Sequence, residues 1–297
     1  MSAPTPSARQ RLRLVATFAA TATLLAGSLV AAAVQAQPQA KVPSEPLRIQ
    51  ATPTPQGDIL RYVQKLADAD GNGLKLKVIE NASVDPNQLL LKGDIDANLY
   101  QHQPYFASWL ARHPEGKDKL IPAATLLVNV FGLYSSKFKS VKDIPEGASL
   151  LVPNEQTNLP RALFILQNEG LLKLSHSKSD GSPAALAIDE KSIVSNPKKL
   201  KFVPTDTRLR AKALPDVEAS FINGDIALTH DIDPRTALSL EDKANNPYAN
   251  ILTVRSDLLK DPRIQLLVNY LTGKQVAKFI DDNYKGFVAP VQQRLIP

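Results

Sequence analysis

Hydrophobic residues along this chain alternate between two spacings, one typical of strands and the other of helices. In 74–79, apolar residues alternate with Lys75 and Lys77, which is the period of a half-buried strand. In 59–66, apolar residues recur at the spacing of one helix face. This alternation of strands and helices predicts an α/β sheet with crossover helices. The predicted strands are 47–51, 74–79, 126–134, 149–152 and 200–203, the predicted helices are 59–66, 161–169, 262–271 and 275–281, and 192–197 is a predicted turn.

A short pattern in the first part of the chain returns in the second part. The segment 93–97 reads Gly-Asp-Ile-Asp-Ala, and 224–228 reads Gly-Asp-Ile-Ala-Leu. In each segment a turn residue and an acid precede apolar residues, which predicts a short strand with polar groups at its far end. We expect both far ends to face one shared crevice. The polar residues there are Tyr100 and His102 in the first segment, and His230, Asp231 and Asp233 in the second.

This organisation predicts two α/β lobes joined by two crossing segments. We expect the chain to cross near 130–134 and again near 246–252. The first lobe then combines 47–132 with 247–297, and the second lobe is 133–246. With 43% hydrophobic residues in the chain, two modest cores can be buried.

Two polar segments together favour a pocket for a zwitterion such as an amino acid. In 93–105, the pattern of a buried strand is followed by aromatic and imidazole side chains. Strands of a sheet often end in this way beside a ligand-binding cleft. In 154–161, polar capping residues and Arg161 begin an apolar helical run. Helix N-termini attract anions, and a guanidinium binds a carboxylate through two hydrogen bonds. We therefore predict that Arg161 binds the ligand's carboxylate, with Asn158 as a donor or helix cap.

Four blocks of sequence carry a resemblance to a known family. They are Ala51-Thr52-Pro53 with Ile59-Leu60, then 93–105, then Val152-Pro153-Asn154 through Thr157-Asn158-Leu159 to Arg161, and finally Asn246-Pro247-Tyr248-Ala249-Asn250. In these blocks the chain resembles the methionine-binding (NlpA-type) lipoproteins, solute-binding proteins of bacterial ATP-driven importers. The resemblance implies a two-lobed periplasmic-binding-protein fold, type II-like, with two interlobe crossings. It also implies delivery of a small amino acid, methionine or a related compound, to the permease of an ABC transporter.

The resemblance also assigns roles to individual residues. Taken alone, Tyr100, His102 and Tyr105 are as well explained as core aromatic residues with satisfied polar ends. The resemblance instead implies that these three residues form the wall of the ligand's side-chain pocket. Asn250, the polar residue after the Pro-Tyr dipeptide, is expected to contact the amino or carboxylate end of the ligand.

The sequence departs from the family pattern at two places. Ala82-Ser83 stands where methionine binders usually have an aromatic residue, which removes one apolar wall of the pocket. The family's usual Ile-Asn-Thr is aligned with 229–231, which reads Thr-His-Asp here. We expect Asp231 to pair with the ligand's ammonium, or to select a more cationic ligand, because a buried carboxylate requires a partner.

The amino end has the pattern of a secretory signal peptide. Three arginines precede an apolar, Ala-rich run from Leu14 to Val34, and small residues before Gln37 suit cleavage. We therefore predict a signal peptide at 1–36, a Pro-containing lead-in at 37–46 and a periplasmic protein. The alternative is that the segment is not cleaved and stays in the membrane as an anchor. Contact with the membrane is expected only through such an uncleaved segment or through the transporter. The sequence contains no cysteine, so lipid attachment through cysteine is excluded.

The charge of the chain gives no support to nucleic-acid binding. Without Arg9, Arg11 and Arg13 the 35 basic residues become 32 against 29 acidic ones, and the net charge falls from +6 to +3. The basic residues are dispersed along the sequence. No cofactor is expected, because the first loop, 51–55, contains no glycine for a phosphate cradle.

Two other functions stay open as alternatives. A metal-binding transport protein would use some of the chain's histidines, which are His102, His113, His176 and His230. A hydrolase would use His230 with Asp231 and Asp233, but this group lacks a fixed motif spacing and an evident nucleophile. We therefore predict that the protein is not an enzyme and has neither catalytic residues nor a metal site.

Overall fold

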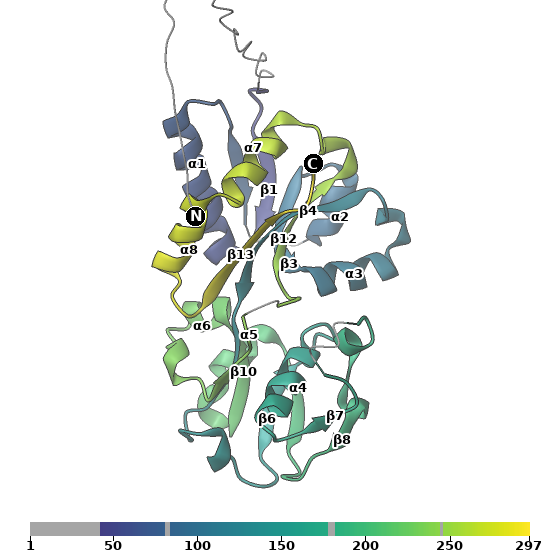
Figure 1. Ribbon diagram of the computed structural model, residues 1–297, viewed down its shortest axis with the longest axis vertical. Helices are drawn as coiled ribbons and strands as arrows, with labels where there is room; N and C mark the ends of the chain where they lie inside the picture. Colours follow the sequence, from purple (N-terminus) through teal and green to yellow (C-terminus); the bar gives the residue numbers. More distant parts are fainter. Residues whose placement is uncertain (1–41, 81–83, 178–181, 244–245) are drawn as a thin grey trace, which may run out of the picture. The chain divides into compact units, whose positions relative to one another are not determined.

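The computed structural model describes residues 42–80, 84–177, 182–243 and 246–297 (Figure 1). The predicted signal peptide, most of the lead-in and Ala82-Ser83 lie outside these residues. Within the described ranges, every helix is too short or too polar to cross a membrane.

The first sheet has the strand order β13-β4-β12-β3-β1-β2. β1 pairs in parallel with β2 and β3, whereas β12 is antiparallel to both β3 and β4, and β13 is antiparallel to β4. It therefore combines strands from both ends of the described chain. Its strands are β1 (Leu47–Ala51), β2 (Leu76–Ile79), β3 (Ala97–His102), β4 (Leu120–Asn129), β12 (Asn250–Arg255) and β13 (Val288–Arg294).

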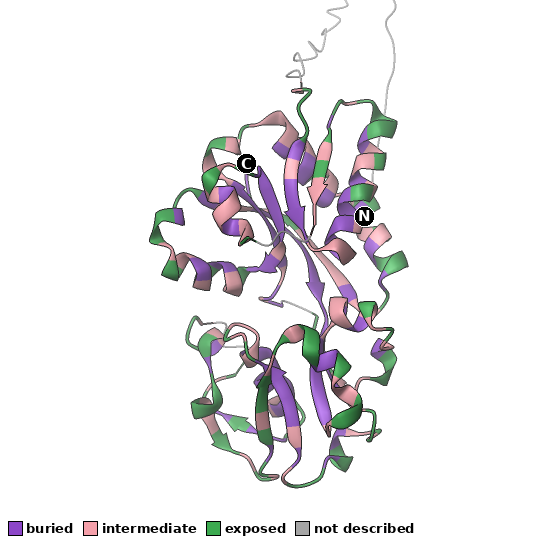
Figure 2. Cartoon of the chain, turned by 180° about the vertical axis from the view of Figure 1, so that it is seen from behind, coloured by how far each residue is buried: buried purple, intermediate pink, exposed green. Residues whose placement is uncertain are grey.

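Helices cover this sheet and bury apolar faces against it. In α1, residues Ile59, Leu60, Val63 and Ala67 are buried at helical spacing, as the sequence pattern predicts. Figure 2 shows the buried strands and the exposed outer surfaces of the helices. The helices are α1 (Asp58–Asp70), α2 (Pro86–Lys92), α3 (Gln103–Arg112), α7 (Pro262–Leu271) and α8 (Lys274–Asn283), and the loop segment η1 (Pro53–Gly57) precedes α1.

The second sheet has the order β11-β5-β10-β6-β9 and is built from the middle of the chain. Its own hydrophobic core includes Phe131, Phe164 and Phe221. A short antiparallel pair, β7 with β8, lies outside the sheet. The strands are β5 (Phe131–Tyr134), β6 (Ser149–Pro153), β7 (Lys173–Leu174), β8 (Ile193–Ser195), β9 (Lys201–Thr205), β10 (Ala219–Asn223) and β11 (Ser239–Leu240), and the helices are α4 (Leu159–Asn168), α5 (Thr207–Lys212) and α6 (Gly224–Thr229).

The chain passes between the two sheets at Val130, and again between β11 and β12. At the first crossing the N–H of Val130 donates to the carbonyl of Phe287, just before β13, at 2.9 Å. The start of α6 approaches the same carbonyl, because a Cβ at Gly224 would lie 1.9 Å from it. Only glycine permits this approach of α6 to the first sheet.

Three of the predicted elements differ from the structure. The predicted strand 126–134 is two strands, because Val130 lies between β4 and β5; Phe131 and Gly132, assigned to the first lobe, belong to the second sheet. The predicted strand 224–228 is the helix α6, since the strand β10 ends one residue earlier. Over five residues, apolar spacing cannot separate a strand from one helical turn. The predicted turn 192–197 contains β8, which pairs with β7.

Candidate functional site

A cluster of buried polar side chains lies where the chain passes between the sheets. Asn129 and Asn250 lie at the ends of β4 and β12, and His102 ends β3. Arg161 comes from the first turn of α4, and Glu241 follows β11. All five residues are buried. The crossing segments therefore carry polar groups from both sheets into one place.

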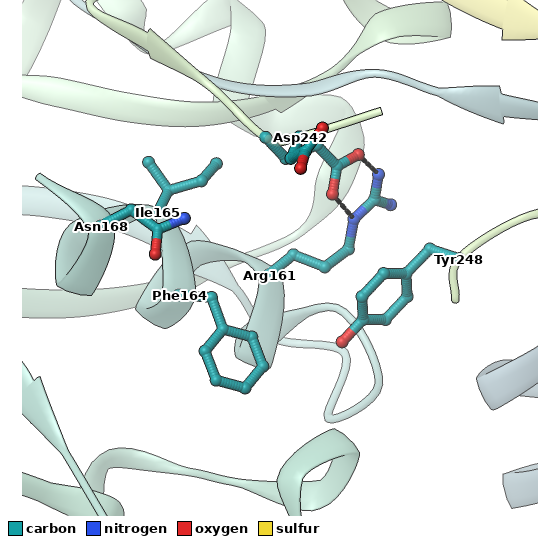
Figure 3. Close-up of a pocket in the computed structure, with 7 residues that line it drawn as sticks. Arg161, Phe164, Ile165, Asn168, Asp242 and Tyr248 are labelled. Carbon is teal, nitrogen blue, oxygen red and sulfur yellow. Dashed lines mark hydrogen bonds and ion pairs between the residues drawn. The ribbon is translucent and has the colours of Figure 1, made fainter. Parts of the chain in front are cut away.

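Arg161 forms the central ion pair of this cluster. Its Nε donates to Oε2 of Glu241 at 3.1 Å, and its Nη2 donates to Oε1 of the same carboxylate. Nη2 also donates to the carbonyl of Asn129 at 2.7 Å. The guanidinium carbon lies 4.7 Å from the ring centre of Phe131 and 4.9 Å from that of Tyr248. Figure 3 shows Arg161 reaching this carboxylate with Tyr248 beside it.

This arrangement limits how many hydrogen bonds Arg161, the predicted partner of the ligand's carboxylate, can give to a ligand. A guanidinium has five N–H donors. Those on Nε and Nη2 are used by Glu241 and Asn129, and one on Nη1 donates to Oδ1 of Asn158 at 3.2 Å. One N–H of Nη1 remains. Arg161 can therefore give a ligand a single hydrogen bond, while Glu241 already neutralises its charge.

His102 connects β3 to the start of α4. Its Nδ1 accepts from the N–H of Tyr105 at 3.1 Å, which places the ring proton on Nε2. Nε2 then donates to Oδ1 of Asn158 at 3.1 Å. Burial, together with the charge of Arg161, lowers the pKa of His102 to about 3. The imidazole is therefore neutral at physiological pH, and the amide NH2 of Asn158 is left to donate to a ligand.

Tyr100 and Tyr105 lie beside His102. Their rings meet edge to face with centres 6.1 Å apart, and the rings of His102 and Tyr105 meet in the same way at 6.3 Å. Burial raises the pKa of both phenols, so both stay protonated. The three residues form one aromatic wall, as expected for a side-chain pocket.

Asn250 joins this wall to the first loop of the chain. It pairs with His102 across β12 and β3, and its Oδ1 accepts from Nε2 of Gln56 at 2.9 Å. Gln56 lies in η1 and is completely buried. Because Oδ1 of Asn250 is used by Gln56, its amide NH2 is the group that can donate to a ligand.

Several buried polar atoms in and around this cluster have no hydrogen-bond partner within the described part of the chain. An unpaired buried polar group costs about 1–3 kcal/mol, so such a concentration of them calls for an external partner. They come from strands of the first sheet and the loop after β1, from the segments that follow β6 and β10 of the second sheet, and from the residues just before β12. A polar ligand bound between the sheets requires polar groups from both sides. The atoms are Oε1 of Gln50, Oε1 of Gln56, the hydroxyl of Tyr100, Oδ1 of Asn129, Oγ1 of Thr157, Oδ1 of Asp225 and the hydroxyl of Tyr248.

A largely apolar cavity of about 880 Å³ adjoins the cluster. One side of it is formed by α3, through Pro104 and Ala107, and the other by the start of α4 and the turn at Ala185–Ala187. Thr157, one of the residues with an unpaired buried oxygen, belongs to its lining. The cavity therefore gives a ligand apolar space next to polar groups.

Asp231, the predicted partner of the ligand's ammonium, lies outside the buried cluster. Asp231 is exposed on the turn after α6, with φ 54°. Because 224–228 is a helix and not a strand, the polar residues at the carboxyl end of the preceding strand, β10, are Asn223 and Asp225.

The structure gives no support to the alternative metal site or to the alternative hydrolase site at His230, Asp231 and Asp233 within the described residues. The carboxylate of Asp233 pairs with Arg235, and Nδ1 of His230 bonds to the carbonyl of Ile226. In the described ranges, no three His, Cys, Asp or Glu side chains are grouped so that they could hold a metal ion. His113 stacks on Trp109, with ring centres 4.3 Å apart.

Sequence reasoning missed several residues of the cluster. Tyr248 stands inside the Asn-Pro-Tyr-Ala-Asn block that was singled out, so its aromatic ring was the available signal. Asn223 and Asp225 were hidden by the predicted strand. Glu241 and Gln56 carry no local signal, because only the tertiary structure brings them to Arg161 and Asn250.

The chain is similar to known proteins over most of its length. The sequence profile of the NlpA lipoprotein family matches residues 47–292. Methionine-binding lipoprotein MetQ of Bacillus subtilis is 35% identical over 248 residues, which cover 82% of this chain and 88% of that protein.

Solved structures agree with this result. A putative methionine-binding lipoprotein from Bacillus subtilis superposes with a TM-score of 0.74 at 33% identity, covering 83% of this chain and 98% of the other. A nutrient-binding protein from Burkholderia cenocepacia bound to methionine superposes with a TM-score of 0.73 at 36% identity, covering 82% and 99%. These similarities confirm the predicted fold class and the predicted family: the chain belongs to the NlpA lipoprotein family.

Proposed function

We propose that this protein is an exported solute-binding protein that delivers a small amino acid, methionine or a related compound, to an ABC importer. The observation that carries the proposal is the concentration of unpaired buried polar atoms in the first sheet, in the segments that follow β6 and β10, and before β12. The relatives support the ligand class, because one is named a methionine-binding lipoprotein and another was solved bound to methionine.

We propose that the lobes divide the chain as its sheets do. The first lobe comprises 47–129 and 250–297, and the second comprises 131–243. A ligand that contacts both lobes binds the closed arrangement better than an open one, so its binding free energy stabilises closure. The permease can then distinguish loaded protein from empty protein.

Within the site, we assign the ligand contacts to Tyr100, His102, Tyr105, Asn158 and Asn250. The aromatic wall receives the apolar side chain, which extends toward the adjoining cavity. The amide groups of Asn158 and Asn250, together with the remaining N–H of Arg161, donate to the carboxylate. These are neutral or already neutralised donors, so they orient the ligand without a large charge–charge attraction.

We propose that the protein binds its ligand without converting it. His102, the histidine inside the cluster, is held neutral by its lowered pKa, and its ring nitrogens are used by Asn158 and the N–H of Tyr105. It therefore lacks both the basicity and the free nitrogen of a general base. For localisation we propose export to the periplasm through the segment 1–36, with no anchor on cysteine, since the sequence has none.

Calorimetric titration with a panel of amino acids tests the proposal. We expect one-to-one binding of a zwitterion, with methionine among the tightest ligands, and recovery of the ligand chemically unchanged. Tyr100→Phe should weaken binding by about 3- to 10-fold, because one neutral hydrogen bond to the ligand is lost. The stability of the free protein should not fall, since the hydroxyl of Tyr100 has no partner within the described chain.

Tyr62→Phe is the matched control, because Tyr62 stacks on Phe279 in the outer helices. This variant should bind as tightly as the wild type. Failure of every amino acid in the panel to bind, or conversion of the ligand to a product, would contradict the proposed function.

A further inference from the structure

Asp225 is an acid in this site whose role neither the sequence nor the family similarity explains. It is the second residue of α6, immediately after β10 and its last residue, Asn223. The close approach of Gly224 to the carbonyl of Phe287 brings this turn against the first sheet. α6 also contacts η1, the loop that carries Gln56. Figure 1 shows α6 beside the start of β13. Asp225 therefore lies at the boundary of the two sheets.

The carboxylate of Asp225 is incompletely satisfied. Its hydrogen bonds come from backbone N–H groups, its own and that of Ile226, while Oδ1 is buried and has no partner among the described residues. Burial raises the pKa of this carboxyl, although the charges of Arg161 and Arg210 act in the opposite direction. The ionised carboxylate is thus destabilised by desolvation, and a positive partner would stabilise it.

The two guanidinium groups near Asp225 are already paired with other acids. Arg161 is bound by Glu241 through two hydrogen bonds. Arg210, which is fully buried, lies 3.5 Å from Glu155. It also donates to the carbonyls of Phe221 and Thr205 and to Oδ1 of Asn223, at 2.7, 2.8 and 3.0 Å.

With the Asp225 carboxyl ionised, the three acids and two arginines of the site sum to one excess negative charge. Each arginine has its own acid, and Asp225 is the acid left over. An anionic ligand group would gain little from the paired guanidiniums, whereas a cationic group would find an unpaired carboxylate in a desolvated place. There, a charged hydrogen bond is worth more than a neutral one.

We infer that Asp225 binds the protonated nitrogen of the ligand and makes the site selective for compounds that carry a free amine. This inference rests on the proposed function and deepens it, because it names the ligand group that the chain recognises most strongly. Amino acids fulfil this requirement, and so do amines that lack a carboxylate. N-acylated amino acids do not, because acylation removes the positive charge.

The inference is tested by calorimetry with L-methionine and N-acetyl-L-methionine on the full chain and on Asp225→Asn, which keeps the shape of the side chain. We expect the wild type to prefer methionine by at least about 10-fold. Asp225→Asn should weaken methionine binding by at least about 10-fold and change N-acetylmethionine binding by less than about 3-fold. The control is Asp216→Asn, an exposed acid of the same lobe, which should leave both affinities unchanged.

Two results would overturn the inference: equal binding of the two ligands by the wild type, or unchanged methionine affinity in Asp225→Asn. The first needs no variant, so it applies even if Asp225→Asn fails to fold. If no amino acid binds, the proposed function fails, and 3-(methylthio)propylamine, the amine of methionine without its carboxylate, becomes the probe. Binding of this amine that Asp225→Asn weakens by about 10-fold would support the inference by itself, and no binding would overturn it.

Discussion

The carboxyl ends of β3 and β10 lie in different sheets, and each ends beside a buried arginine. At β3, the neutral imidazole of His102 is linked through an amide to Arg161, whose charge Glu241 neutralises. At β10, Asn223 holds a second arginine, but the next side chain, Asp225, keeps an unpaired oxygen. Among the described residues, every charge at the end of β3 is paired, whereas at the end of β10 the carboxylate of Asp225 has no positive partner.

This difference separates residues that hold the structure in place from residues that bind the ligand. A buried ion pair that is fully hydrogen-bonded holds the crossing segments in position, and it has little left to offer a ligand. An acid without a cation is destabilising until a ligand supplies one. We therefore expect breaking the Arg161–Glu241 pair to act mainly on stability, and replacing the Asp225 carboxylate to act mainly on affinity.

The largest effect is expected for Glu241→Ala, which leaves the charge of Arg161 buried without an acid. The free energy of unfolding should fall by about 3–5 kcal/mol in denaturant titrations. Glu146→Ala is the control, because the Glu146 carboxylate pairs with Lys199 at the surface and should contribute less than about 1 kcal/mol. Equal losses in the two variants would remove the distinction between the buried pair and a surface pair.

The pH dependence of stability should come partly from His102. Its pKa in the folded protein, about 3, lies below the ordinary value of 6.5, so the unfolded chain takes up the proton first as the pH falls. The contribution to stability is complete above pH 6.5 and is lost toward pH 3, by up to about 1.4 kcal/mol per pH unit. Between pH 7 and pH 5, the free energy of unfolding of His102→Asn should fall less steeply with decreasing pH than that of the wild type. Equal pH dependences in the two proteins would contradict this prediction.

Asn223→Ala tests the support of the second arginine. It removes the acceptor that Arg210 uses at 3.0 Å, and a hydrogen bond to a charged group contributes about 1.5–3 kcal/mol. The free energy of unfolding should fall by this amount. Because Arg210 would then lack one of its partners near Asp225, the affinity for methionine should change as well. An unaltered unfolding curve would show that Asn223 does not hold this arginine.

The smallest effect is expected for Asp231→Asn. The structure places this residue on an exposed turn, so its substitution should change methionine affinity by less than about 2-fold. The sequence interpretation, in which Asp231 pairs with the ligand's ammonium, predicts a large loss instead. Calorimetry on this variant therefore decides between Asp231 and Asp225 as the acid of the site.

The sequence pattern predicted the regular parts of the fold well. The strand β1 and the helix α7 have the predicted bounds, because their apolar spacing extends over whole elements and their ends carry clear signals. Pro262 follows Asp261, which caps α7 through the N–H of Arg263.

The repeated Gly-Asp-Ile segment shows where the prediction fails. Gly93 has φ 82° and ends α2 before a strand, whereas Gly224 begins α6 after a strand. The same residues therefore stand at opposite ends of a helix. What separates them is the preceding chain, apolar and extended in 219–223, together with the backbone contact at Phe287 that only the tertiary structure contains.

The site was predictable where its residues follow one another in sequence. His102 and Tyr105, or Asn158 and Arg161, contact each other within one turn, so their types and spacing carry a signal. Glu241 and Arg161 are 80 residues apart, and no local pattern announces that one neutralises the other. The ion pair of Arg161 with Glu241 could not be predicted for this reason.

The central claim, that the unpaired polar atoms between the sheets receive a zwitterion, is tested most directly by a crystal structure of the protein with L-methionine. We predict ligand density between the two sheets, with the ammonium within hydrogen-bond distance of Oδ1 of Asp225 and the carboxylate near Asn250 and Asn158. Methionine bound elsewhere on the surface, with these atoms still unpaired, would contradict the claim.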